Sequence, residues 1–194
     1  MKRLAFILVA LVTVATAGFG QTKYTADLSA TQLKWKGTKV VGEHVGTIQL
    51  KEGWIKWKKN SLVSGSFAID MGTLKDEDQK DDKMRTMLEN HLKSDDFFGV
   101  EKFPVSTLEI NTPTAFRNGK AYITGNLTIK GIKQPVSFNA TVSDHGNELV
   151  FVAPITVDRT KYGLKYGSGK FFSNLGDKAI SDEFTLDVIL VVKK

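Results

Sequence analysis

The chain has no cysteine and only three histidines among its 194 residues. The absence of cysteine excludes disulfide frameworks, thiolate metal sites, cysteine nucleophiles and a lipid anchor on an N-terminal cysteine. Three histidines leave little room for a metal centre built from several histidines. Beyond the first twenty residues there is no long apolar run, so we predict that the mature chain has no transmembrane segment.

Length and composition indicate a single globular domain. At about 150 residues per domain, the chain holds one domain and room for a leader. The balance of 25% charged and 41% hydrophobic residues excludes intrinsic disorder for most of the chain. The net charge of +6 includes alternating lysines, such as Lys34 and Lys36, that are typical of outward-facing strand positions. With no recognition helix or aromatic–basic motif, we predict no nucleic-acid partner.

The start of the chain has the layout of a secretory signal peptide. A basic start (MKR) precedes apolar residues 4–14, which are too few for the roughly 20 that span a bilayer. Small residues follow, and cleavage after Ala17 or after Gly20 fits them equally well. We therefore predict a signal peptide over residues 1–20, a folded domain over residues 21–194, and export to the periplasm or beyond.

The rest of the chain alternates apolar and polar residues with a period of two. This alternation predicts strands with one buried and one solvated face, as in antiparallel sheets. Short turn signals join neighbouring strands at Asn118-Gly119, Gly131 and residues 145–147, so we predict an all-β meander that closes into an antiparallel barrel. The strands are expected at residues 33–38, 45–50, 54–58, 63–71, 121–129, 136–142, 149–157 and 184–192.

Two segments interrupt the strand pattern. Residues 78–92 begin with acidic side chains, which a helix N-terminus favours, and an amphipathic helix is predicted there to cover one end or flank of the barrel. Residues 159–178 are rich in glycine and aromatic residues and are predicted to form a loop or lid. The helix would present an apolar stripe of Met84, Met87, Leu88 and Leu92.

The alternation alone leaves open whether the barrel is filled or hollow. An eight-stranded barrel is either filled by side chains or holds one small ligand. The inward-facing set mixes large residues such as Phe67 and Phe138 with small ones such as Gly125 and Ala153. That mixture suits a cavity and a tapering core equally well.

No complete catalytic, cofactor or metal motif is present. The glycine-rich residues 163–170 fail as a phosphate loop because Phe171 stands where a Ser or Thr must bind Mg²⁺. Asp76 and Asp78 have the spacing of a calcium loop, but Lys80 occupies a ligand position. His44 and His91 are a weak metal signal, and no nucleophile elbow occurs. We therefore predict no catalytic residue, metal or cofactor.

Five motifs in order along the chain resemble the YceI-like family of secreted bacterial proteins. The resemblance extends from about Tyr24 to the C-terminus, and one departure is Leu108, where the family has an aromatic residue after its Phe-Pro segment. That departure bears on the shape of a cavity. The motifs are Trp35 with residues 42–46 (GEHVG), residues 65–71 (GSFAIDM), residues 91–98 (HLKSDDFF), Phe103-Pro104 and residues 158–163 (DRTKYG).

The resemblance implies a lipocalin-like, eight-stranded antiparallel barrel with a helix packed at its side. It also implies that the barrel is hollow and encloses a long-chain isoprenoid or a fatty amphiphile, which the protein would bind, store or transport in the periplasm without catalysis. A homodimer is compatible with the resemblance. Combined with the alternation, it predicts that the ligand tail contacts Phe67, Ile69, Ile123, Leu127, Phe138, Phe151 and Leu186.

The polar end of such a ligand needs a partner. Arg159 is the candidate, because a guanidinium binds phosphate or carboxylate through two parallel hydrogen bonds. The alternative for Arg159 is a salt bridge with Asp158 or with a carboxylate of the helix. Candidates for the barrel mouth or a lid, each with plain hydrophobic packing as its alternative, are Trp35, Tyr162, Tyr166 and Phe171.

Two other functional classes remain open at this point. One is a hydrolase of the cell envelope with its active site in the cavity, which a carboxylate pair or a Ser–His contact inside the barrel would favour. The other is a stress-response module that binds proteins and has a filled barrel, which a fully packed interior would favour.

Overall fold

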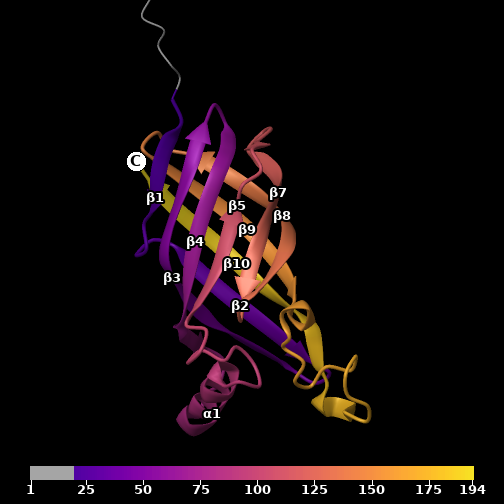
Figure 1. Ribbon diagram of the computed structural model, residues 1–194. Coiled ribbons are helices and arrows are strands. Elements are labelled where there is room, and N and C mark those ends of the chain that lie inside the picture. Colours follow the sequence, from indigo (N-terminus) through magenta and orange to yellow (C-terminus); the bar gives the residue numbers. More distant parts are fainter. Residues whose placement is uncertain (1–19) are drawn as a thin grey trace, which may run out of the picture.

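The computed structural model describes residues 20–194, so the predicted signal peptide lies outside the described residues except for Gly20 (Figure 1). Strands dominate the chain, with one α-helix and two short 3-10 helices. The elements are β1 (Thr22–Ala26), β2 (Gln32–Lys39), β3 (Glu43–Lys58), β4 (Ser61–Asp76), α1 (Asp82–Lys93), β5 (Val105–Ile110), β6 (Thr114–Ala115), β7 (Lys120–Ile129), β8 (Ile132–Asp144), β9 (Glu148–Asp158), η1 (Arg159–Tyr162), η2 (Gly176–Lys178) and β10 (Ile180–Lys193).

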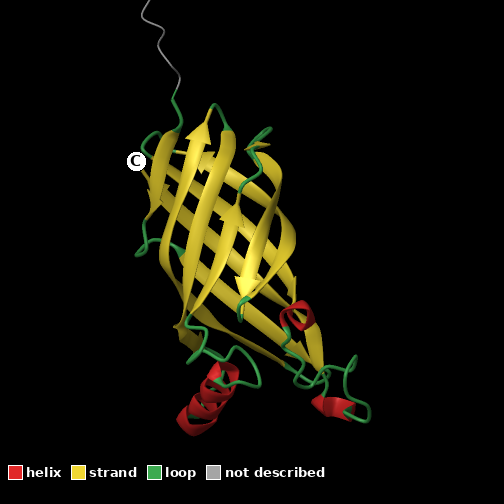
Figure 2. Cartoon of the chain, viewed as in Figure 1, coloured by secondary structure: helices red, strands yellow, loops and turns green. Residues whose placement is uncertain are grey.

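Eight strands close into an antiparallel barrel (Figure 2). Each of β2, β3, β4, β5, β7, β8, β9 and β10 pairs with the next in this order, and β10 returns to pair with β2. Closure leaves none of these strands as a free edge, which removes the hazard of edge-to-edge association. The predicted eight-stranded antiparallel meander is therefore confirmed.

Two strands, β1 and β2, pair with different parts of the same edge of β3. β2 pairs with the first part of β3, and β1 pairs with residues 54–57 of the same strand. β1 also pairs with the end of β10, through Thr25 with Lys193 and Ala26 with Val192. Asp27 begins the turn between β1 and β2, and its Oδ1 accepts hydrogen bonds from the amides of Ser29 and Ala30. Its Oδ2 lies 2.6 Å from Nζ of Lys193.

Replacing Asp27 by asparagine is expected to make the free energy of unfolding less dependent on pH in the acidic range. The hydrogen bond from Lys193, and then those from residues 29 and 30, hold the pKa of Asp27 well below its ordinary 3.8. A lowered folded-state pKa stabilises the protein above pH 4, and this contribution is lost as the pH falls below 4. Urea midpoints of wild type and Asp27→Asn should therefore differ at pH 7 and converge towards pH 2.5. A difference that stays constant with pH would contradict this account.

Tight turns join several of the strands. Asn118-Gly119 and Lys130-Gly131 are two-residue turns in which both residues have positive φ, the conformation that matches the twist of a hairpin. The glycine in each turn is the signal from which the sequence predicted it. Lys59-Asn60 has the same geometry between β3 and β4 but lacks a glycine, and the sequence prediction missed it.

The predicted strands at residues 45–50 and 54–58 are in fact one strand, β3. Gly53, which falls between the two predicted strands, lies in the ladder opposite Phe67. A Cβ on Gly53 would come within 2.7 Å of the Phe67 ring, so the glycine makes room for that ring. A second correction concerns Val63, which the alternation in residues 63–71 predicts to face the same way as Phe67. Val63 has no partner, because Leu62 pairs with Trp57 and Ser64 with Lys56. This bulge turns Leu62 inward in place of Val63.

The helix is shorter than predicted. β4 continues to Asp76, which pairs with Gly46, and α1 begins only at Asp82. Oδ1 of Asp81 caps the helix by accepting a hydrogen bond of 2.9 Å from the amide of Met84. The helix lies beyond one end of the barrel, on the same side as the loop of residues 159–179 (Figure 1). Among the described residues, no helix has the length and apolar character to cross a bilayer.

Replacing Asp81 by alanine is expected to destabilise α1 by about 1 kcal/mol, the usual contribution of an N-cap side chain. None of the residues of α1 is fully buried, so the loss should appear first as faster hydrogen exchange of the α1 amides. Asp82→Ala removes the same charge next to the cap, together with an exposed ion pair to Arg85, and serves as the control. Exposed ion pairs contribute little, so the expected change is within about 0.5 kcal/mol. Equal acceleration of exchange in both variants would show that the cap is not responsible.

Candidate functional site: the barrel cavity

The barrel is hollow. Its interior holds a cavity of about 540 Å³ whose wall includes residues from all eight barrel strands. The wall is predominantly apolar, with Leu, Ile, Val and Phe side chains from each strand. At the end away from α1, Trp57, Phe116 and Phe151 pack ring against ring with centroids 5.4–5.7 Å apart. This cluster closes that end, and the opposite end is the mouth of the cavity.

All seven side chains predicted to contact a ligand tail lie in the cavity wall, and their contact with a ligand stays a prediction. Phe67, Ile123, Phe138 and Phe151 are buried, whereas Ile69, Leu127 and Leu186 are partly exposed to the cavity. Leu108 also lines the wall, where its side chain takes up less space than an aromatic ring would. The seven are Phe67, Ile69, Ile123, Leu127, Phe138, Phe151 and Leu186.

Small side chains hold part of the cavity open. Ala140 of β8 and Ala153 of β9 both line the wall and are almost fully buried. Ala140 pairs with Ala121 of β7, and Ala153 pairs with Val188 of β10. Small residues at neighbouring positions of adjacent strands leave space that larger side chains would fill. In this barrel the mixture of large and small inward residues therefore produces a cavity.

The helix contributes to the mouth. Leu88 and Leu92 line the cavity, whereas Met84 and Met87 of the predicted stripe are exposed by 52% and 57%. Four apolar residues at helical spacing thus divide into two that face the barrel and two that face solvent. The sequence prediction did not assign Leu88, Leu92 or His91 to the cavity, although the spacing of Leu88 and Leu92 already placed them on one helical face.

Aromatic rings from three segments meet at the mouth. The ring centroid of His91 lies 5.1 Å from that of Phe97 and 4.6 Å from that of Tyr166. Phe97 follows α1, and Tyr166 comes from the loop of residues 159–179. Edge-to-face contacts of this kind add to the stability gained from burial alone. They tie the helical segment to the loop beside the cavity.

Two of the four predicted mouth residues line the cavity. Trp35 and Tyr166 do, and Nε1 of Trp35 donates hydrogen bonds to the carbonyl oxygens of Thr47 and Lys75. Tyr162 does not, because η1 turns its side chain into the packed core, where burial raises the pKa of its phenol. Phe171 is 46% exposed and also does not line the cavity.

The guanidinium of Arg159 is committed to backbone carbonyls. Nε donates to the carbonyl oxygen of Ser181 at 2.8 Å, Nη1 to that of Leu164 at 2.7 Å and Nη2 to that of Ile180 at 3.1 Å. The side chain is 4% exposed and its Nη2 lies 4.0 Å from Oδ1 of Asp182. Arg159 lines the cavity, but it joins η1 and its loop to β10. Binding of a ligand head group by Arg159 stays a prediction, and these contacts favour a structural role.

The alternative salt bridge of Arg159 with Asp158 or a helix carboxylate is not found; its carboxylate neighbour is Asp182. Asp158 instead caps η1, accepting hydrogen bonds from the amide and hydroxyl of Thr160. Burial raises the pKa of Asp158, but the hydrogen bonds from Thr160 and the charge of Lys170 outweigh it and lower the pKa overall. The loop beside the mouth is thus held by ion pairs of Arg159 with Asp182 and of Lys170 with Asp158.

Proteins of known sequence place the chain in a family. The YceI-like domain matches residues 24–192. A UPF0312 protein of Pseudomonas paraeruginosa is 33% identical over 87 residues, which are 42% of this chain and 45% of that protein. A UPF0312 protein of Staphylococcus aureus is 32% identical over 85 residues, 40% of this chain and 47% of that protein. In these alignments the chain spans about half the length of the curated relatives it matches.

Solved structures share the fold. BcnA of Burkholderia cenocepacia superposes with a TM-score of 0.69 at 20% identity, covering 86% of this chain and 98% of BcnA. A polyisoprenoid binding domain from Saccharophagus degradans, implicated in plant cell wall breakdown, gives a TM-score of 0.63 at 12% identity, covering 88% and 97%. At such identities the likeness establishes the barrel alone. The match over residues 24–192 confirms the resemblance seen in the motifs: the chain belongs to the YceI-like domain family.

Proposed function

We propose that this protein is exported to the periplasm and there binds a long-chain amphiphilic lipid, whose tail occupies the barrel, as a carrier or a store. The observation that carries the proposal is the predominantly apolar cavity of about 540 Å³ inside the barrel. Its volume falls within the roughly 300–1,000 Å³ that is usual for small-molecule sites. A cavity of this size counts against the alternative of a filled barrel that only binds proteins.

Burial of the tail would supply the binding free energy. Each CH₂ group removed from water contributes about 0.8 kcal/mol, so ten such groups contribute about 8 kcal/mol before the costs of association. The wall offers apolar contacts along the barrel from Phe151 near the closed end to Leu92 at the mouth. An extended hydrocarbon chain matches this shape, and a polyisoprenoid or a fatty-acid-like amphiphile has one.

The polar head of the lipid would lie at the mouth. His44, His91, Lys39 and Lys178 are among the polar residues that line the cavity there. Arg159 also lines the cavity, but carbonyl oxygens engage three of its donors. The polyisoprenoid binding domain of Saccharophagus degradans, which shares the fold, supports an isoprenoid as the class of ligand to test first.

The test is recovery of the lipid with the protein. The full chain would be expressed in a Gram-negative host, purified from the periplasm without detergent, extracted with organic solvent and analysed by mass spectrometry. We expect about one long-chain isoprenoid, quinone or fatty amphiphile per protein. A protein that emerges without lipid and takes up no added isoprenoid or fatty acid would contradict the proposal. Protein found in the cytoplasm with its first twenty residues intact would contradict the proposed export.

A further inference from the structure

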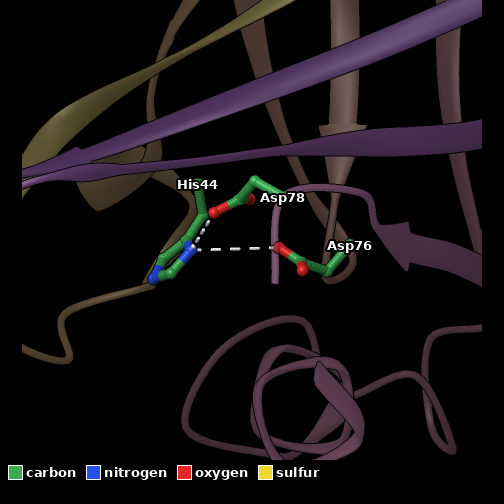
Figure 3. A group of neighbouring side chains, drawn as sticks. All are labelled: His44, Asp76 and Asp78. Atoms are coloured by element: carbon green, nitrogen blue, oxygen red, sulfur yellow. Dashed lines mark hydrogen bonds and ion pairs between the residues drawn. The ribbon is translucent and has the colours of Figure 1, made fainter. Parts of the chain in front are cut away.

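A histidine and two carboxylates converge beside the barrel mouth (Figure 3). His44 is the second residue of β3, Asp76 is the last residue of β4, and Asp78 lies in the turn that leads to α1. Nδ1 of His44 lies 3.0 Å from Oδ2 of Asp78 and 3.9 Å from Oδ2 of Asp76. One donor atom from each of the three residues falls within 4.8 Å of the others.

One of these oxygens is buried without a partner. The side chain of Asp76 is 0% exposed, and its Oδ1 accepts a hydrogen bond of 2.9 Å from the amide of Gln79. Within residues 20–194, Oδ2 of Asp76 has no hydrogen-bond donor. This oxygen is directed towards His44 (Figure 3). A buried carboxylate oxygen without a donor is costly, so the site requires a proton or a cation.

His44 alone satisfies this requirement poorly. A proton on Nδ1 of His44 is best placed to hydrogen-bond with Oδ2 of Asp78, which is 3.0 Å away. Oδ2 of Asp76, at 3.9 Å from the same nitrogen, is then left without a donor. Because the Asp76 side chain is buried away from water, a nearby positive charge would stabilise its carboxylate. A cation between the three donors would accept the lone pairs of all of them at once.

We propose that His44, Asp76 and Asp78 bind a divalent transition-metal ion of the Zn²⁺ class, with water completing its coordination. One imidazole nitrogen with two carboxylate oxygens suits zinc or a similar ion, whereas Ca²⁺ and Mg²⁺ prefer oxygen ligands alone. Bonds of about 2.0–2.1 Å in a tetrahedron place neighbouring ligand atoms about 3.3 Å apart. The distances of 3.0 and 3.9 Å lie on either side of that value.

Outer contacts already orient the carboxylates. The amide of Val45 donates to Oδ1 of Asp78 at 2.8 Å, and the amide of Gln79 orients Asp76. Such contacts are the usual support of metal ligands. The amide of Asp76 also donates to Oε1 of Glu89 on α1 at 3.1 Å. A metal here would fasten β3 to the turn before α1, and since His44 lines the cavity, it would fix the helix that borders the mouth.

The test is titration of the exported protein with Zn²⁺ alone. After chelation and dialysis at pH 7, calorimetry should show one ion bound per chain and a higher Tm with the ion. Loss of an outer contact typically weakens metal binding about 10–100-fold, so loss of a ligand in Asp76→Asn or His44→Ala should weaken it by at least about 100-fold. His145→Ala, on the exposed turn between β8 and β9, should bind as wild type does.

The outcomes separate a metal from a proton. A folded wild-type protein that takes up no Zn²⁺ would overturn the proposal and assign a proton to Asp76. Uptake that Asp76→Asn leaves unchanged, or that His145→Ala removes, would also overturn it. If Asp76→Asn fails to fold, Asp78→Asn provides the same test at a side chain that is 32% exposed. The proposal does not depend on lipid binding, because it rests on the positions of the ligand atoms of His44, Asp76 and Asp78.

Discussion

Replacing Ala153 by phenylalanine should remove most lipid binding and leave the barrel folded. Ala153 is 5% exposed, lines the cavity and pairs with Val188. A ring at this position occupies space that the proposed tail would use. If the tail gives up three CH₂ contacts, the loss is about 2.4 kcal/mol, or about 50-fold in affinity. Because Ala153 borders the cavity, the added ring has space to enter, and the cost in stability should stay within the usual range of about 1–3 kcal/mol for a larger core side chain.

The neighbouring position provides the matched control for this lumen variant. Val152 precedes Ala153 on β9 and is 46% exposed on the outer face of the barrel. Val152→Phe adds a ring to the same strand without narrowing the cavity. Lipid recovered per protein and displacement of a fluorescent fatty acid measure both variants, with Tm as the check of folding. Equal losses in the two variants would show that the ligand does not occupy the lumen.

The closed barrel could be predicted because alternation is a local property of the sequence. A side chain two residues along a strand faces the same way, so Phe138 and Ala140 share a face whatever strand lies beside them. That rule held for all seven predicted lumen residues. It failed at Val63, because a bulge is set by the pairing of two strands and leaves no mark on one of them.

The contacts at the mouth depend on the fold as a whole. His44 and Asp76 are 32 residues apart in the chain, and the register of β3 against β4 brings them together. Sequence spacing led us to compare Asp76 and Asp78 with a calcium loop, which lacks the histidine. The hydrogen-bond partners of Arg159 could likewise not be predicted from the sequence, because every residue has a carbonyl oxygen. Only the path of the loop decides which three of these oxygens the guanidinium contacts.

Replacing Arg159 by alanine should lower the free energy of unfolding by about 3–5 kcal/mol. The change leaves three carbonyl oxygens without their donors, each costing about 1–3 kcal/mol when buried, with water recovering part of the loss. It also removes the positive charge beside Asp182. Since most domains are stable by only about 5–15 kcal/mol, this is a large share. Arg117→Ala, at an exposed arginine, should change stability by less than about 0.5 kcal/mol.

Lysine at the same position separates the structural role of Arg159 from the predicted role in binding a head group. A lysine keeps the charge, but its single ammonium lacks the planar fork that reaches three carbonyls in different directions. If Arg159 joins the loop to β10, Arg159→Lys should lose stability to an intermediate degree in urea unfolding, and lipid binding by the folded fraction should persist. If the guanidinium instead binds the head group, stability should change little in Arg159→Lys while lipid affinity falls. The three carbonyl contacts lead us to expect the first result, because a donor engaged by the backbone is not available to a ligand.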